Sequence, residues 1–376
     1  MIGRLDMPAL IRLGVAALIL IGAVALPAGS IDDRPVGLSA GAGDVALLAI
    51  AAAAFFASVV VPGGRGESRG ALLAVASVAL GVVLLLDLGD GLVYRGGAPA
   101  VLLLLIAIVV LLWQAMSQLS AARGRAAAIV VPLLFGGLLV YLWEALTVGF
   151  QVPAVLLPPP SAIAESFRAH QFTLWIDFRQ TFIKSVIPGF VMGSGAGFLV
   201  AVAIDRSPFL QRGLQPLGSM ISAMPIVGIA PIMVMWFGFD WQSKAAVIVV
   251  MTFFPMLVNT LAGLQVTGLM ERDLMRSYAA SYFQALVKLR LPGAMPFVFN
   301  ALKLNSTLAL IGAIVAEFFG TPIMGMGFRI STEVAKLNVD FVWATIAVAA
   351  LAGSASYGAL VLMERATTFW HPSYRK

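Results

Sequence analysis

The sequence contains no cysteine and only two histidines. Without cysteine, the chain cannot have a disulfide framework, a thiol nucleophile or a thiolate metal site. The histidines, His170 and His371, lie far apart in the sequence and outside the apolar runs. A metal site built on histidine is therefore not expected.

Charged residues are also scarce, at 11% of the chain, whereas hydrophobic residues make up 60%. A soluble domain carries about 25% charged residues. Because a water-facing fold could not bury this much apolar surface, the composition predicts an integral membrane protein. The apolar runs are continuous and do not alternate with period two, which favours membrane helices over an outer-membrane barrel. The net charge of +6 comes from basic residues in short loops, so a nucleic-acid partner is not expected.

Motifs for catalysis and for nucleotide binding are missing as well. The sequence has no G-x-x-x-x-G-K-[ST] loop, which would cradle the phosphates of ATP, and no H-E-x-x-H motif. No serine and histidine stand in an arrangement that suggests a nucleophile and its base. We therefore expect neither enzymatic activity nor a cofactor in this chain.

The apolar runs predict an all-α fold with about ten transmembrane helices. Each crossing of the hydrocarbon takes roughly 20 apolar residues. The runs of this length are 9–28, 44–62, 70–88, 98–116, 127–149, 182–204, 213–238, 244–266, 296–318 and 341–363. Residues 1–30 also fit a signal peptide, because a basic start and an apolar run precede the small residues at Ala28-Gly29-Ser30. Its removal would leave the other spans and their orientation unchanged.

Basic residues predict which face of the membrane each loop occupies, because cytoplasmic loops carry an excess of lysine and arginine. With the N-terminus in the cytoplasm, most of the 24 lysines and arginines fall in cytoplasmic segments. This orientation places both termini and residues 271–292 in the cytoplasm.

The chain divides into two parts of different character, with a predicted boundary between residues 125 and 126. Residues 1–125 hold four spans that are rich in Ala, Leu and Val and carry no distinctive motif. Residues 126–376 hold six spans, interrupted by prolines, glycines, asparagines and carboxylates. After the first of these six spans, three prolines precede Ser161, which suits a helix N-cap. We expect an amphipathic helix on the outer face there.

Residues 271–292, ERDLMRSYAASYFQALVKLRLP, form a polar segment between two apolar spans. In one helix, apolar residues from Leu274 to Leu289 would form a stripe at three- and four-residue spacing. The small residues Ala279-Ala280-Ser281 would permit a sharp bend and the close approach of another protein. The composition leaves two interpretations open, a docking element for a protein and an amphipathic helix on anionic lipid.

This segment resembles the cytoplasmic coupling loop of permease subunits in binding-protein-dependent ABC importers. That loop has a Glu-Ala-Ala triplet, a Gly after three further residues, and Leu-Pro twelve residues after the Gly. Counted back from Leu291-Pro292, the Gly position is Ala279 and the triplet is Asp273-Leu274-Met275. The carboxylate is kept as Asp, while both alanines and the glycine are replaced. We call residues 271–292 the coupling segment.

Other runs resemble the same family, in particular its nitrate, sulfonate, taurine and pyrimidine-precursor branch. They are Leu157-Pro158, Met224-Pro225, Trp236-Phe237-Gly238, Phe253-Phe254-Pro255 with Val258-Asn259-Thr260, and the run that ends at Gly320. The resemblance covers residues 127–370, and the first four spans have no counterpart in it. It implies a multi-pass protein of the bacterial inner membrane, a homodimer with two cytoplasmic ATP-binding subunits that carry ATP and Mg²⁺, and a periplasmic binding protein that delivers substrate.

The resemblance also assigns residues to the coupling with the ATPase. A short helix near residues 273–285 would sit in a groove of the ATPase subunit. The residues implied are Asp273, Leu274, Met275, Arg276, Ala279, Ala280, Ser281, Phe283, Leu291 and Pro292.

Polar and helix-breaking residues within the spans are candidates for the pore or a gate, because such residues are costly in lipid. They are Met224, Pro225, Asn259, Thr260, Asn305, Ser306 and Glu317. For most of the polar residues, hydrogen bonds between helices are the alternative role. Gly189, Gly193 and Gly197 recur every four residues, which indicates close helix contact, with a homodimer interface as one use of it.

The predicted function is that of an importer's permease subunit. Its substrate would be a small polar or weakly charged organic solute, because few of the candidate pore positions are charged. The rival interpretation is a secondary transporter driven by an ion gradient. The sequence shows neither the internal repeat nor the intramembrane charges typical of that class.

Overall fold

The computed structural model describes residues 29–31, 34–36, 51, 53–54, 66–89, 99–121, 125–207, 209–210, 213, 225–320 and 323–369. Nearly all of these residues are helical, as the sequence predicts. A short antiparallel hairpin is the exception, in which β1 (Gly29–Ile31) pairs with β2 (Arg34–Val36). The predicted span 9–28 and most of span 44–62 lie outside the described residues.

The chain folds into two compact units, Met1–Ala162 and Ile163–Lys376. In the first unit, α3 (Gly66–Gly89), α4 (Pro99–Ala121) and α5 (Arg125–Gly149) pack side by side around a core that includes Leu80 and Leu111. This division differs from the boundary predicted at residues 125 and 126, because α5 shares its core with α3 and α4.

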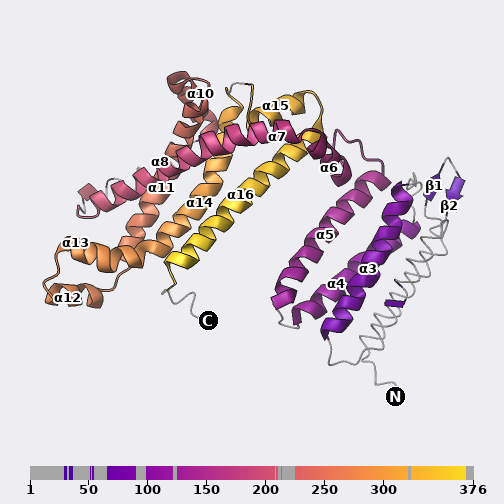
Figure 1. Ribbon diagram of the computed structural model, residues 1–376, viewed down its shortest axis with the longest axis horizontal. Helices are drawn as coiled ribbons and strands as arrows, with labels where there is room; N and C mark the ends of the chain where they lie inside the picture. The colour runs from indigo at the N-terminus through magenta and orange to yellow at the C-terminus, as the bar shows by residue number, and fades with distance from the viewer. Residues whose placement is uncertain are drawn as a thin grey trace, which may run out of the picture. The chain divides into compact units, whose positions relative to one another are not determined.

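Unit 2 is built around α11 (Trp241–Gln265), which packs against α8 (Ile187–Ile204) and α14 (Leu291–Glu317) (Figure 1). The remaining long helix is α16 (Val339–Thr367), which lies against α14. Shorter helices, α10 (Ile226–Phe237) and α15 (Met326–Ala335), stand at one end of these long helices. A second pair of short helices, α12 (Leu269–Ser277) and α13 (Tyr282–Ala285), stands at the other end.

Two of the long helices begin well before the predicted spans. After α6 (Pro160–Ala169), the elements α7 (Gln171–Phe178), the π-helical segment η1 (Arg179–Val186) and α8 follow without interruption. Likewise α13, the π-helical segment η2 (Leu286–Arg290) and α14 form one helix. The predicted spans 182–204 and 296–318 therefore coincide with the later parts of these two helices, which begin at Gln171 and Tyr282.

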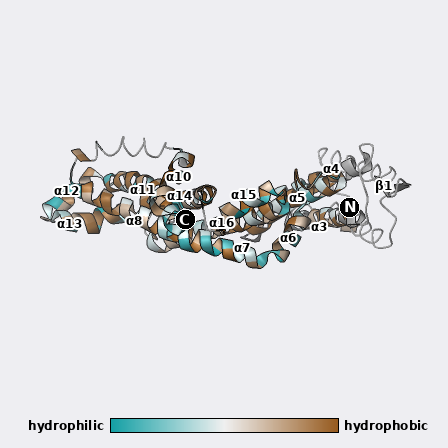
Figure 2. Ribbon diagram, turned by 90° about the horizontal axis from the view of Figure 1, so that it is seen from above, coloured by the Kyte–Doolittle hydropathy of each residue, from teal (hydrophilic) through white to brown (hydrophobic). Residues whose placement is uncertain are grey.

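Five helices of the described part are long and apolar enough to cross a membrane. They are Ala127–Gly149, Gln171–Ile204, Trp241–Gln265, Tyr282–Glu317 and Val339–Thr367. Shorter apolar helical stretches lie at Gly70–Val82, Leu105–Ala121 and Val227–Phe237. The count of ten spans stays a prediction. Figure 2 shows that hydrophilic residues gather at α12, beyond the apolar helices.

The glycine stripe of α8 is used inside this chain. A methyl group at Gly189 would come within 2.7 Å of the Ile248 side chain in α11. Gly193 and Gly197 face the same helix, so all three buried glycines permit the close packing of α8 on α11. The predicted close helix contact is confirmed, but its partner is α11 and not a second copy of the chain.

Candidate functional site

The coupling segment forms a helix, a tight turn and a second helix at one end of unit 2 (Figure 1). Helix α12 ends at Ser277, and α13 begins at Tyr282. The amide of Ala280 donates to the carbonyl of Met275 at 3.0 Å, and that of Ala279 donates to the carbonyl of Arg276 at 2.9 Å. This pair of bonds is a Schellman C-cap. The bend predicted at residues 279–281 is therefore confirmed, whereas the single helix with one apolar stripe is not formed.

Ala279 occupies the left-handed position of this cap, with φ of 49°. Glycine is the usual residue there, because a Cβ clashes with the backbone in this conformation. The position matches the glycine of the family motif. The turn therefore has a left-handed residue at the position aligned with the glycine of the motif, although the residue is alanine.

Ser281 starts the second helix through a reciprocal capping box. The Ser281 hydroxyl accepts a hydrogen bond from the backbone amide of Gln284 at 3.3 Å. The backbone amide of Ser281 donates to the side-chain oxygen of Gln284 at 2.9 Å. Such a box satisfies two of the amides that a helix start leaves without partners. Ser281 thus fixes the angle at which α13 leaves the turn.

Two arginines hold the coupling segment against the end of α11. Arg272 donates from Nε to the Thr267 hydroxyl at 3.0 Å and from Nη2 to the Gln265 carbonyl at 3.1 Å. Arg290 donates from Nε and Nη2 to the carbonyl of Leu264 at 3.0 and 2.9 Å. Because the last carbonyls of a helix lack internal partners, the two guanidinium groups cap α11.

The outer surface of the coupling segment is apolar and exposed. The large side chains that share this exposure in the coupling segment are Leu274, Tyr278 and Phe283, and Leu269 and Met270 at the start of α12 continue it; all five are between 57% and 84% accessible. No residue of α12 or α13 is buried within this chain. Exposed large apolar side chains that gather in one short segment are candidates for an interaction site.

The other predicted coupling residues divide between this surface and the anchor. Asp273 and Arg276 form an exposed ion pair at 3.5 Å. Met275 and Ala280 are half-buried beside the turn. Leu291 packs in an apolar cluster with Leu264, Leu286 and Ala294, and Pro292 follows it at the junction of η2 and α14, inside the continuous helix.

The polar residues predicted toward the inner half of the spans mostly bond within their own helices. Asn259 donates to the Pro255 carbonyl at 2.8 Å, and Ser306 donates to the Lys303 carbonyl at 2.8 Å. Thr260 is fully buried, and its hydroxyl has no hydrogen-bond partner among the described residues.

Pro225 was expected inside a membrane span, but it lies directly before a helix. Pro225 precedes α10 as its N-cap residue, so it does not interrupt a described helix. Its side chain is exposed. Pro231 does lie inside α10. Met224 lies outside the described residues.

Asn305 joins three helices at the centre of unit 2. Its Nδ2 donates to the Ser194 hydroxyl of α8 at 2.9 Å and to the Thr252 carbonyl of α11 at 2.8 Å. The side chain is fully buried, and its Oδ1 has no partner among the described residues. Of the predicted pore candidates, Asn305 thus has the alternative role of a hydrogen bond across helices.

Glu317 ends α14 in a buried polar pocket at the opposite end from the coupling segment. Its carboxylate accepts bonds from the Thr181 hydroxyl at 2.8 and 3.0 Å and from the Gly327 amide at 2.7 Å. The side chain is 2% exposed. These bonds satisfy a carboxylate that would otherwise be costly to bury. They hold the end of α14 to η1 and to the start of α15.

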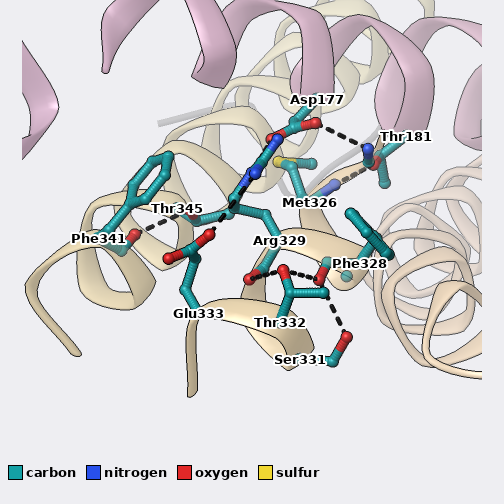
Figure 3. A network of polar contacts seen from close by, with 12 residues as sticks. Asp177, Thr181, Met326, Phe328, Arg329, Ser331, Thr332, Glu333, Phe341 and Thr345 are labelled. Carbon is teal, nitrogen blue, oxygen red and sulfur yellow. Dashed lines mark hydrogen bonds and ion pairs between the residues drawn. The ribbon is translucent and has the colours of Figure 1, made fainter. Parts of the chain in front are cut away.

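A second carboxylate extends this network, as Figure 3 shows. Asp177 accepts a hydrogen bond from the backbone amide of Gly325 at 2.8 Å. It also forms an ion pair with Arg329, with 2.8 Å between the carboxylate and Nε. Met326 donates its amide to Thr181 at 2.7 Å. The loop before α15, including Gly325 with φ of 126°, is therefore fixed against α7 and η1.

Glu333 of α15 completes the charged part of this network (Figure 3). Burial by itself raises the pKa of Glu333. The hydrogen bonds from Asn338 and Lys336, with the charges of Lys336 and Arg329, outweigh this and hold the pKa below its ordinary value. Glu333 therefore stays ionised and keeps its partners at neutral pH.

Sequence analysis did not find several buried charges at this end of unit 2. Lys244, the first residue of the predicted span 244–266, was not singled out, but it is 1% exposed and donates to the Phe239 carbonyl at 2.6 Å. Asp177 and Arg329 were not singled out either. The available signal was a charge within or beside an apolar run, which is a functional candidate by default.

Comparison with known families and proteins gives a consistent result. A family model described as "Binding-protein-dependent transport system inner membrane component" matches residues 159–368. A "Probable ABC transporter permease protein" of Haemophilus influenzae is 29% identical over 215 residues, which are 57% of this chain and 87% of the relative. A putative aliphatic sulfonates transport permease protein of Bacillus subtilis is 26% identical over 244 residues, 64% of this chain and 88% of the relative. A formylaminopyrimidine transport permease protein of Halalkalibacterium halodurans is 28% identical over 239 residues, with shares of 64% and 95%.

Proposed function

Because the chain belongs to the family of binding-protein-dependent transport system inner membrane components, we propose that it forms the membrane pathway of an ATP-driven importer. In this proposal two copies of the chain assemble with two cytoplasmic ATPase subunits. A periplasmic binding protein delivers the solute to the opposite face. ATP-driven movement of the ATPases then alternates the pathway between outward-open and inward-open states, with both termini of each chain in the cytoplasm.

The observation that carries this proposal is the exposed apolar surface of α12, which begins two residues before the coupling segment. Leu269, Met270 and Leu274 of α12 lie between two membrane helices but are not buried by this chain. The capped turn and the two arginine anchors give them a fixed frame. A surface that is both apolar and rigidly held suits docking into a groove of another protein.

The energy for transport comes from another subunit in this proposal. Its sequence has no P-loop to hold nucleotide, so ATP and Mg²⁺ belong to the partner ATPase in this proposal. A ligand shifts a conformational equilibrium only through its different affinity for the two states. ATP can therefore drive transport only if the closure of the ATPases moves the coupling segment with the membrane helices.

For the substrate, the proposal extends to a class only. The names of the relatives refer to aliphatic sulfonates and to formylaminopyrimidine, which are small and polar. Among the predicted pore candidates, Asn259, Thr260 and Ser306 are polar and uncharged, and Glu317 is the one with a charged side chain. Both observations favour a small polar or weakly charged organic solute.

The test is co-purification of the detergent-solubilised chain with the ATPase subunit encoded beside its gene. Met270→Arg and Leu274→Arg each place a charge on the exposed surface without touching the anchors. The matched control is Val334→Arg, which changes a side chain of α15 that is 51% exposed at the other end of unit 2. We expect the wild type and the control to retain the ATPase and the two α12 variants to lose it.

The contrary result is equally clear. If a folded wild-type chain retains no ATPase, or if the α12 variants retain as much as the control, the coupling segment is not the dock. An amphipathic helix on lipid and transport driven by an ion gradient would then be the better interpretation.

A further inference from the structure

A buried carboxylate connects the end of α8 to the coupling segment. Asp205 follows the last residue of α8, and its side chain is 1% exposed. Arg290 of η2 pairs with it through both terminal nitrogens, with 2.7 Å between Nη2 and Oδ1. The hydroxyl of Tyr282, the first residue of α13, donates to Asp205 Oδ2 at 2.8 Å. One carboxylate thus receives bonds from two separate elements of the coupling segment.

Helix capping does not explain an aspartate at this position. The C-terminus of a helix carries a partial negative charge, so an acidic residue there is unfavourable. Asp205 is nevertheless buried at the end of α8. Its position is explained by the guanidinium of Arg290 and the phenol of Tyr282, which together offset the helix end and the loss of hydration.

An apolar cluster next to Asp205, Arg290 and Tyr282 strengthens their polar contacts. Leu264, Leu286 and Ala294 form an apolar cluster on which Tyr282 and Leu291 pack. In such a low-dielectric setting, a paired charge is held more firmly than it would be in water.

Two further contacts extend the junction on either side. Arg206, the residue after Asp205, stacks over the Tyr282 ring at 4.8 Å. Arg290 also caps the Leu264 carbonyl of α11. The junction therefore ties α8, α11 and α13 together at one point.

We propose that Asp205, Arg290 and Tyr282 form a latch that makes the coupling segment move as one body with α8 and α11. The latch residues are positioning residues, because they lie behind the exposed surface of α12 and transmit its displacement to the membrane helices. This role rests on the proposed function, in which the ATPase displaces α12. The rigidity of the latch can be measured without the ATPase.

The absence of cysteine from the chain allows a direct test with spin labels. Cysteines are introduced at Leu199, which is exposed on α8, and at Ser277, which is exposed at the end of α12. Pulsed dipolar spectroscopy then gives the distance between the two labels in the full chain in nanodiscs. Labelled chain is diluted with unlabelled chain, so that only pairs within one copy contribute.

Two variants break the latch in different ways, and a third is the control. Tyr282→Phe removes one hydroxyl but keeps the ring, its packing and the Asp205–Arg290 pair. Asp205→Asn removes the charge and leaves a buried arginine without its carboxylate. Tyr357→Phe removes the hydroxyl of a half-exposed tyrosine in α16. Because Asp205→Asn can fail to fold, Tyr282→Phe carries the conclusion.

Without the ATPase, we expect a single narrow distance in the wild type and in Tyr357→Phe, and loss of that narrow distribution in both latch variants. With the ATPase bound and nucleotide trapped by vanadate, the wild-type distance stays the same, because α12 and α8 move together. In Tyr282→Phe the ATPase still co-purifies but the distance shifts. A residue that only stabilises the fold would not produce this nucleotide-dependent shift.

The latch is overturned if Tyr282→Phe keeps the narrow wild-type distribution both before and after vanadate trapping. The proposed function fails separately, if no ATPase co-purifies with the labelled wild type. In that case the measurement without ATPase still decides whether Asp205, Arg290 and Tyr282 hold the coupling segment rigidly.

Discussion

Ala279 shows how a single residue can depart from a motif while its backbone does not. It is one of a few non-glycine residues of the described chain with positive φ, together with Gln151 and Leu337. For an alanine this conformation costs roughly 1–2 kcal/mol. Two backbone hydrogen bonds of the Schellman cap hold it there. The turn is therefore formed at a cost that a glycine would not incur.

We therefore predict that Ala279→Gly stabilises the coupling segment by about 1 kcal/mol, which slows its local opening by roughly fivefold. The greater freedom of glycine in the unfolded turn reduces the gain but does not cancel it. The measurement is amide hydrogen exchange of residues 275–285 in nanodiscs.

The neighbour of Ala279 provides the control. Ala280 lies outside the left-handed region, so Ala280→Gly has only the entropic cost and speeds the exchange. If exchange slows equally in both variants, or does not slow in Ala279→Gly, the positive φ of residue 279 does not reduce the stability of the turn.

Asn305 and Ser306 illustrate what a linear sequence hides at this scale. The two polar residues are adjacent, and both were candidates for the pore on the same grounds. In the structure Asn305 bonds to α8 and α11, whereas the bond that Ser306 makes among the described residues is to Lys303 of its own helix. Their difference depends on the rotation of α14 against its neighbours, which hydrophobic periodicity fixes only coarsely.

At the scale of elements, the packing of α8 on α11 depends on small residues at one helix face. Gly193 has the backbone of Val249 and the side chain of Thr252 directly above it, whereas a methyl group at Gly195 would meet no atom within 4 Å. The two positions share a helix and a residue type but face different surroundings.

This pair gives a matched prediction. Gly193→Ala forces α8 away from α11 and destabilises unit 2 by about 1–3 kcal/mol, the usual cost of overpacking a tight contact. Gly195→Ala leaves the packing intact, so the stability stays the same or rises slightly through higher helix propensity. Thermal unfolding in detergent, followed by tryptophan fluorescence, compares the two. Equal unfolding temperatures would mean that α8 and α11 do not pack as closely as the structure shows.

The coupling segment shows which features of an element are local enough to be predicted. The bend at Ala279-Ala280-Ser281 was expected from small residues, and the cap and the capping box involve bonds over short sequence distances. The prediction of one apolar stripe along a single helix was wrong, because the turn separates α12 from α13 and changes the direction of the chain between them. Tyr282 thereby faces Asp205, while Leu274 stays exposed.

For the molecule as a whole, composition and hydropathy were sufficient for the class and for the approximate positions of the five long apolar helices in the described part of the chain. They could not supply contacts between distant residues. Asp205 and Arg290 are 85 positions apart, and Thr181 and Glu317 are 136 positions apart. Of these four residues, only Glu317 was singled out from the sequence, as a pore candidate, and Arg290 was placed only as part of the coupling segment. Their pairing exists only once the helices are packed.

The two units have separate cores, although one chain carries both. The core of unit 1 consists of residues from α3, α4 and α5 with Ala51 and Ala54. The core clusters of unit 2 contain residues from Ile163 onward. The family match begins at residue 159, close to the division of the units. The coupling segment, its anchors and the latch all belong to unit 2.

We therefore predict that unit 2 retains the ATPase after its covalent link to unit 1 is cut. A protease recognition sequence is inserted after Ala154, an exposed residue in the loop between α5 and α6. In the same loop region, Ser161 bonds to Glu144 through its amide at 2.9 Å and its hydroxyl at 2.7 Å. Glu144→Ala removes these two hydrogen bonds between the cleavage fragments, which are then applied to size exclusion.

The expected result is a cleaved unit 2 that binds the ATPase as strongly as the uncleaved variant does, because every contact that frames α12 lies within residues 163–376. Its unfolding temperature should equal the corresponding transition of the intact chain, since neither core loses a member. Loss of the ATPase on cleavage, with unit 2 still folded, would show that unit 1 contributes to the coupling. The role of the N-terminal spans would then have to be sought in the ATPase contact and not in a separate function.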